Sequence, residues 1–183
     1  MNQAIRIRLM EAALNEAQRG MAAKEVPIGC VIARQFGSRV TIVARGFNRV
    51  NGLQRRNAHA EIVAFENAGI VRSTGRARLP LSADNAILIS TLEPCVMCLG
   101  AAMEAGITDV IFGLHAPADN GTQRVRPPQS PESTSPRIRG GILWDRSYEL
   151  FVKWLRDNNN SEQAKFVRQL IALNEKAASS SRI

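Results

Sequence analysis

Two short stretches of the chain carry the residues whose types could do chemistry, His59 and Glu61 in the first, Cys95 and Cys98 in the second. One histidine and two cysteines give three zinc ligands, the number found in catalytic sites that leave a fourth position open for water. A structural zinc site takes a fourth protein ligand, whereas a hydrolytic site needs a nearby group that moves protons. The set therefore predicts one catalytic zinc ion held by the histidine and the two cysteines, with Glu61 as the proton carrier.

The spacing of these residues predicts how they come together. Pro94 precedes Cys95, and because proline is favoured in the first turn of a helix, both thiols are expected on one side of a helix start. His59 and Glu61 share no helix face, but both can reach a ligand that lies beyond a helix N-terminus. We therefore expect two helix N-termini to meet at the ion, where their partial positive charge stabilises thiolates. For Cys-x-x-Cys taken alone, two buried helix cysteines or a redox pair are the alternatives.

Length and composition indicate a single soluble domain over residues 1–183. The hydrophobic content of 45% suffices for a sizeable core, and no apolar run is long enough to cross a membrane. Three cysteines, two of them assigned to the metal, leave no disulfide framework, and the first residues lack the features of a signal peptide. These features predict a cytoplasmic protein.

The formal net charge of +8 bears on possible partners. Arginines flank the helix expected to begin near His59, and a basic face there would attract phosphate-bearing substrates. An arginine-rich solvated surface without a partner is the alternative. The arginines concerned are Arg34, Arg39, Arg45, Arg49, Arg55, Arg56, Arg72, Arg76 and Arg78.

The elements that must position these residues follow from the periodicity of the first half of the chain. Apolar residues recur at helical spacing over 3–19, and two β-branched runs at 26–33 and 40–45 predict an antiparallel hairpin. The helix that carries His59 is expected to end at Gly69, and a polar loop should follow over 71–85.

The next elements predict a parallel pair of strands. An apolar strand at 86–90 leads into the cysteine helix, which ends near Ala105, and a further strand follows at 108–113. This strand, helix and strand order implies a right-handed crossover within a mixed sheet. Beyond it we expect a proline-rich loop over 115–140 that could cover the site, two C-terminal helices within 141–176, and a frayed tail at 177–183.

Four motifs of the chain carry a resemblance to a known family. They are Val26-Pro27-Ile28-Gly29, Gly46-Phe47-Asn48-Arg49, Ala58-His59-Ala60-Glu61-Ile62 and Thr91-Leu92-Glu93-Pro94-Cys95-Val96-Met97-Cys98. These motifs resemble those of the cytidine deaminase superfamily, above all its tRNA-specific adenosine deaminases and, next, its bacterial guanine deaminases. The resemblance covers about residues 3–113. It implies a three-layer α/β/α fold with a mixed central sheet of about five strands, a zinc ion held by His59, Cys95 and Cys98, Glu61 as proton shuttle, and a homodimer.

Smaller candidates complete the expected site. The resemblance implies that Asn48 hydrogen-bonds the target base, although an asparagine after a strand is also a common turn residue. His115 follows a strand and is a candidate for substrate contact, with a surface or capping role as the alternative. Cys30 could line the pocket, complete a four-ligand structural zinc site or be an ordinary buried strand cysteine, and Glu93 could simply favour the helix start. Asp119 has no assigned role.

These observations favour a hydrolytic deaminase that acts on a free purine base or nucleoside and releases ammonia. A tRNA wobble adenosine deaminase is the alternative, but the chain departs from the resemblance after Gly113, where the tRNA enzymes seat their nucleotide. A non-catalytic, zinc-stabilised nucleic-acid-binding module is the remote alternative, which the basic charge permits. Glu61 separates the enzyme from such a module, because a structural zinc site has no need of it.

Overall fold

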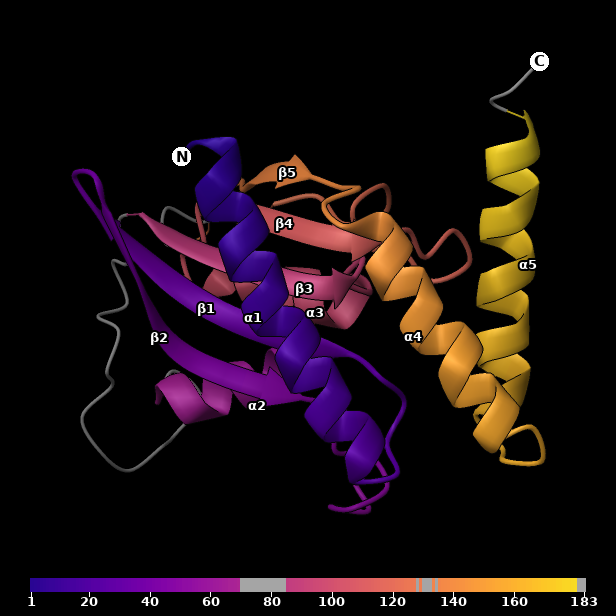
Figure 1. Ribbon diagram of the computed structural model, residues 1–183. Helices are drawn as coiled ribbons and strands as arrows, with labels where there is room; N and C mark the ends of the chain where they lie inside the picture. Colours follow the sequence, from indigo (N-terminus) through magenta and orange to yellow (C-terminus); the bar gives the residue numbers. More distant parts are fainter. Residues whose placement is uncertain (70–84, 128, 130–132, 134, 181–183) are drawn as a thin grey trace.

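The computed structural model describes residues 1–69, 85–127, 129, 133 and 135–180 (Figure 1). Five strands form one sheet in the order β2-β1-β3-β4-β5. Within the described ranges, no helix is long and apolar enough to cross a membrane. The elements are α1 (Gln3–Ala22), β1 (Gly29–Phe36), β2 (Arg39–Phe47), α2 (Ala60–Ala68), β3 (Ala86–Leu92), α3 (Val96–Glu104), β4 (Asp109–Leu114), β5 (Arg137–Arg139), α4 (Trp144–Asp157) and α5 (Ala164–Ser180).

Helices cover both faces of the sheet, as the sequence predicts. Figure 1 shows α1 and α4 in front of the strands and α2 and α3 behind them. The central strand β3 is buried along its whole length, and its successive side chains enter two different hydrophobic clusters. Ile87 and Ile89 pack with Leu9 of α1, while Leu88 packs with Leu99 of α3. This arrangement is the expected three-layer α/β/α fold with a mixed sheet.

The strand pairing also agrees with the sequence. β1 and β2 form the antiparallel hairpin, with an irregularity between Ile32 and Ala33. β3 and β4 are parallel and joined through α3, as the strand, helix and strand order requires. Because β3 ends where α3 begins, this crossover delivers the cysteines to one end of the sheet.

The C-terminal part differs from the expectation in two places. The predicted loop over 115–140 contains β5, which pairs in parallel with β4. β5 has three residues, all exposed, so no apolar alternation marks it in the sequence. The side chains of Arg137 and Asp109 fix it instead, through hydrogen bonds of 2.9 and 2.7 Å. The last helix, α5, continues to Ser180 into the segment expected to fray.

The position of α2 depends on a glycine in β2. A Cβ atom added at Gly46 would lie 2.5 Å from the carbonyl oxygen of Ala60 and 2.5 Å from the amide nitrogen of Ala64, both on α2. Only a residue without a side chain therefore lets the helix backbone lie directly on the strand. At the other end, α2 stops at Gly69, whose φ of 80° is the left-handed conformation that glycine favours. The predicted loop over 71–85 falls outside the described residues, except for its last residue.

Candidate active site

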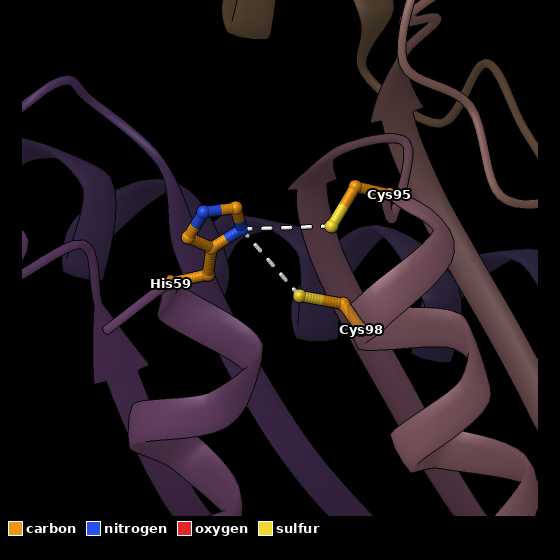
Figure 2. A group of neighbouring side chains, drawn as sticks. All are labelled: His59, Cys95 and Cys98. Carbon is orange, nitrogen blue, oxygen red and sulfur yellow. Dashed lines mark hydrogen bonds between the residues drawn. The ribbon is translucent and has the colours of Figure 1, made fainter. Parts of the chain in front are cut away.

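Two helix starts bring the three predicted metal ligands together. His59 is the N-cap residue of α2, Cys95 is the N-cap residue of α3, and Cys98 lies in the first turn of α3. Figure 2 shows the imidazole turned toward both thiols, with its Nδ1 atom 3.6 Å from each Sγ atom. All three ligand atoms lie within 4.8 Å of one another. The helix N-termini thus meet at one point.

This geometry fits a tetrahedral zinc ion. Bonds of about 2.3 Å to sulfur and about 2.05 Å to nitrogen place the two kinds of ligand atom about 3.5 Å apart. The observed separations of 3.6 Å agree with that value. Two thiolates and one imidazole are ligands that zinc prefers, and they leave its fourth position open. The chain therefore provides a zinc site of the catalytic type.

The two thiols differ in acidity because they share a proton. The hydrogen bond from Cys98, aided by hydrogen bonds from His59 and from a backbone amide, lowers the pKa of Cys95 to about 4. The same contact raises the pKa of Cys98 above its ordinary value, and burial adds to the effect. The contact between the thiols thus favours the charged form of Cys95, and zinc binding releases the protons that its cysteine ligands still carry.

Glu61 lies in the first turn of α2, and its carboxylate is buried. The hydroxyl of Ser90 donates a hydrogen bond of 2.8 Å to Glu61 Oε1. Burial raises the pKa of Glu61, while the nearby charge of His59 and the hydrogen bonds to the carboxylate act in the opposite direction. Ser90 was not predicted as a site residue, although a hydroxyl inside an otherwise apolar strand was a usable signal.

Asn48 connects the end of β2 to the start of α2. Its side-chain oxygen accepts a hydrogen bond of 3.2 Å from the backbone amide of Ala60, and its backbone N–H donates a hydrogen bond of 3.0 Å to the carbonyl of Ile28. The side chain is buried in the wall of a cavity of about 370 Å³ that also exposes His59, Glu61 and Cys95. The amide oxygen is occupied by the helix, so the amide nitrogen is the group left to meet a ligand.

The cavity walls come from segments far apart in the sequence. The apolar side chains of Val26, Ile28 and Leu92 line part of it. The start of the predicted 115–140 loop adds Ala116 and Asp119, so this stretch forms part of the cavity wall. Two further lining residues come from the C-terminal part: Gln163 directly precedes α5, and Phe166 lies in its first turn. No sequence signal marks these two residues, because only the tertiary packing of α5 brings them to the site.

Glu93, which directly follows β3, holds the beginning of the 115–140 segment close to the end of that strand. Its buried carboxylate accepts hydrogen bonds from the backbone amide of Ala116, at 2.9 Å, and from the hydroxyl of Thr122. His115 Nδ1 lies 3.4 Å from the same carboxylate, and the imidazole packs edge-on against Phe112. His115 is exposed and lies outside the set of cavity-lining residues, in contrast to Asn48.

The remaining candidates are placed as follows. Cys30 is fully buried on β1, burial raises its pKa, and the metal-ligand group of the described residues does not include it. Arg55 forms an ion pair of 2.6 Å with Glu66, whereas Arg56 lines the cavity. The predicted basic residues at positions 72, 76 and 78 fall outside the described part of the chain.

Comparison with known proteins identifies the family. Residues 4–114 match the family model of the cytidine and deoxycytidylate deaminase zinc-binding region. The tRNA-specific adenosine deaminase of Streptococcus pyogenes is 36% identical over 104 residues, which are 57% of this chain and 59% of that protein. The chain thus spans somewhat more than half the length of this relative.

Solved structures give the same result for the fold. A structure from a study of A-to-I editing by tRNA:A34 deaminases at the wobble position is 32% identical, with a TM-score of 0.58, and the match covers 78% of this chain and 98% of that one. The guanine deaminase of Nitrosomonas europaea is 23% identical, with a TM-score of 0.63, over 81% of this chain and 83% of that chain, and supports the fold alone. Because residues 4–114 match the family model and the three zinc ligands lie together, the chain belongs to the family of the cytidine and deoxycytidylate deaminase zinc-binding region.

Proposed function

We propose that the protein is a zinc-dependent hydrolytic deaminase that removes the exocyclic amino group of a free purine base or nucleoside. The observation that carries this proposal is the buried carboxylate of Glu61, which lines the cavity beside the three metal ligands. A non-catalytic zinc-stabilised nucleic-acid-binding module would gain nothing from such a carboxylate, and burying a carboxylate costs free energy. A group that moves protons explains its position.

Glu61 and Ser90 would have different roles in the reaction. When bound, zinc polarises the attacking water and lowers its pKa toward neutrality. Glu61 takes a proton from that water and delivers it to the ring nitrogen beside the amino-bearing carbon. The water oxygen bonds to that carbon. Glu61 then moves the proton of the new hydroxyl group to the amino group, the C–N bond breaks, and ammonia leaves as the ring carbonyl forms. Ser90 holds the carboxylate by its Oε1 atom, which leaves Oε2 to carry the protons.

The substrate would be oriented by the cavity wall. The side-chain nitrogen of Asn48 can donate a hydrogen bond to a ring nitrogen or carbonyl of the base, because the oxygen of this amide is held by α2. The cavity of about 370 Å³ lies at the small end of the range for ligand sites, which favours a single base or nucleoside over a larger ligand. His115, also predicted to contact substrate, would affect the substrate only indirectly. It lies against the Glu93 carboxylate, which accepts the hydrogen bond from the backbone of the cavity-lining residue Ala116.

A tRNA wobble adenosine is the second candidate substrate. The relatives named above support it, as does Arg56 in the cavity wall, where a guanidinium could meet a phosphate of an extended strand. Each phosphate neutralised on a single strand contributes about −0.7 to the slope of log affinity against log salt. Deamination of RNA should therefore fall steeply with added salt, whereas turnover of an uncharged base should change little.

An ammonia-release assay tests the proposal. The zinc-loaded protein is offered adenine, guanine, cytosine, their nucleosides, and an anticodon stem-loop that carries adenosine at the wobble position. We expect release from a free purine base or nucleoside, with little dependence on salt. Salt-sensitive inosine formation in the stem-loop alone would select the tRNA alternative, and no release from any of these would refute the deaminase. A homodimer and a cytoplasmic location remain predictions, to be tested by light scattering and by cell fractionation.

A further inference from the structure

Part of the cavity wall is built from α5, an element outside the family match. The matched residues end at position 114, whereas α5 comprises Ala164–Ser180. Gln163, just before its first turn, and Phe166, within it, line the same cavity as His59 and Glu61. Figure 1 shows α5 beside α4, at the side of the molecule away from the hairpin β1–β2. The chain therefore closes its cavity with an element of its own C-terminal part.

Polar contacts at both ends fix α5 to the segments around the site. At its start, Gln163 Nε2 donates a hydrogen bond of 2.6 Å to Asn51 Oδ1, in the turn that follows Asn48. Farther along, the buried side chain of Asn174 donates a hydrogen bond of 2.9 Å to the backbone carbonyl of His115. The peptide unit between residues 115 and 116 is thereby held from two sides, since Glu93 accepts its N–H.

The apolar face of α5 completes the attachment. Val167 and Leu170 are buried in the same hydrophobic cluster as Leu92, Leu114 and Phe151, so the helix is part of the core. Phe166 precedes this buried pair and is itself only partly buried, because it packs against the cluster on one side and faces the cavity on the other. A wall anchored in this way is rigid enough to select by shape.

Phe166 is the one phenyl ring among the described residues that line the cavity. An aromatic ring offers a flat apolar surface on which a nucleobase stacks, whatever the identity of the base. The polar side chains of Asn48 and Glu61 also line the cavity and can hydrogen-bond the edge of a stacked ring. A stacking face on one side and polar groups at the edge are the two features that a site for one planar base requires.

We propose that Phe166 stacks on the base of the substrate, and that α5 restricts the site to a single free base or nucleoside. This inference rests on the proposed function, because the stacked base is the substrate of the same site. Phe166 of α5 lines the cavity together with Ala116 and Asp119, so a bound base would lie against both segments. A nucleotide within folded RNA would bring flanking residues into contact with this wall.

The test separates stacking from folding with substitutions at one position. Phe166→Leu keeps an apolar side chain in the core contact but removes the ring, while Phe166→Tyr keeps the ring. Lys165→Ala, on the exposed side of α5, is the matched control. Each variant is assayed for KM and kcat on the best substrate of the panel above. In a second arm, each is combined with Glu61→Gln to block turnover, and the Kd for adenine, guanine and their nucleosides is measured by calorimetry.

Loss of stacking should raise KM and Kd about 5- to 150-fold in Phe166→Leu, while kcat changes little. Phe166→Tyr and Lys165→Ala should stay within about threefold of the wild type. Unchanged KM and Kd in Phe166→Leu would overturn the inference, as would equal losses in the leucine and tyrosine variants. Binding that depends on the ring without ammonia release from any substrate would refute the proposed function alone. Absence of binding of any base, or turnover of the stem-loop that is insensitive to Phe166→Leu, would overturn the inference.

Discussion

Replacing Gly46 by alanine tests whether α2, and with it His59, is positioned by direct contact of the helix backbone with β2. The new Cβ atom would lie 2.5 Å from the backbone of Ala60 and Ala64, so α2 must move back by roughly 0.9 Å to reach an ordinary contact distance. Overpacking of this kind costs about 1–3 kcal/mol, which lowers Tm by roughly 2–12 °C in a domain of this size. Metal bonds tolerate deviations of about 0.2 Å, so zinc affinity should fall as well.

The assay compares thermal unfolding and zinc transfer to a chromogenic chelator in Gly46→Ala, Gly100→Ala and the wild type. Gly100 is the matched control, because it lies on α3, near the same site, and a Cβ there would meet no atom within 4 Å. Alanine at this helical position should be neutral or stabilise the protein by about 1 kcal/mol. If Gly46→Ala melted and retained zinc like the wild type, the close contact of α2 with β2 would not be what positions His59.

Three further predictions concern the metal, the proton carrier and the edge of the sheet. Cys95→Ala should lose zinc and melt at a lower temperature than the wild type, as elemental analysis and calorimetry would show, because bound metal stabilises the folded chain. Ser90→Ala should keep zinc but shift the pH profile of kcat to higher pH, because Glu61 loses a hydrogen bond that favours its charged form. Although burial acts to raise it, the pKa of Asp109 is held below its ordinary value by hydrogen bonds and charge from Arg137. This pair stabilises the fold above pH about 4 and loses its effect as the pH falls through the lowered pKa. The urea midpoint of the wild type should therefore exceed that of Asp109→Asn at pH 7 and approach it at pH 3, and a constant difference would contradict the ion pair.

Much of the fold was predictable because its core elements carry strong local patterns. The apolar run of β3, the cysteine helix and the next strand are short and sequential, so the handedness of the crossover left one arrangement for them. The metal ligands were predictable for the same reason. His59 and Cys95 each begin a helix, and helix starts have signals in residue type and spacing.

The parts that the sequence did not predict depend on contacts between distant segments. β5 pairs with the edge of β4, and the side chain of Arg137 bonds to Asp109 of that strand. Neither the pairing nor this contact can be recognised from the three exposed residues of β5. The contribution of α5 to the cavity likewise depends on tertiary packing. The periodicity within 141–176 predicts two helices but not which segments they contact. Glu93 was a candidate for favouring the helix start, and its hydrogen bond to the backbone of Ala116 was not predicted.

The most direct test of the deaminase chemistry is ammonia release by Glu61→Gln, with zinc content measured on the same sample. Glu66→Gln is the matched control, because it makes the same chemical change on the same helix, at a residue that pairs with Arg55 and does not line the cavity. We expect both variants to hold one zinc ion per chain and to fold like the wild type. Glu61→Gln should lose at least about 10²- to 10⁴-fold in kcat, because its amide cannot carry a proton, whereas Glu66→Gln should keep its activity. Near wild-type ammonia release by Glu61→Gln with zinc retained would contradict the assignment of Glu61 as the proton carrier.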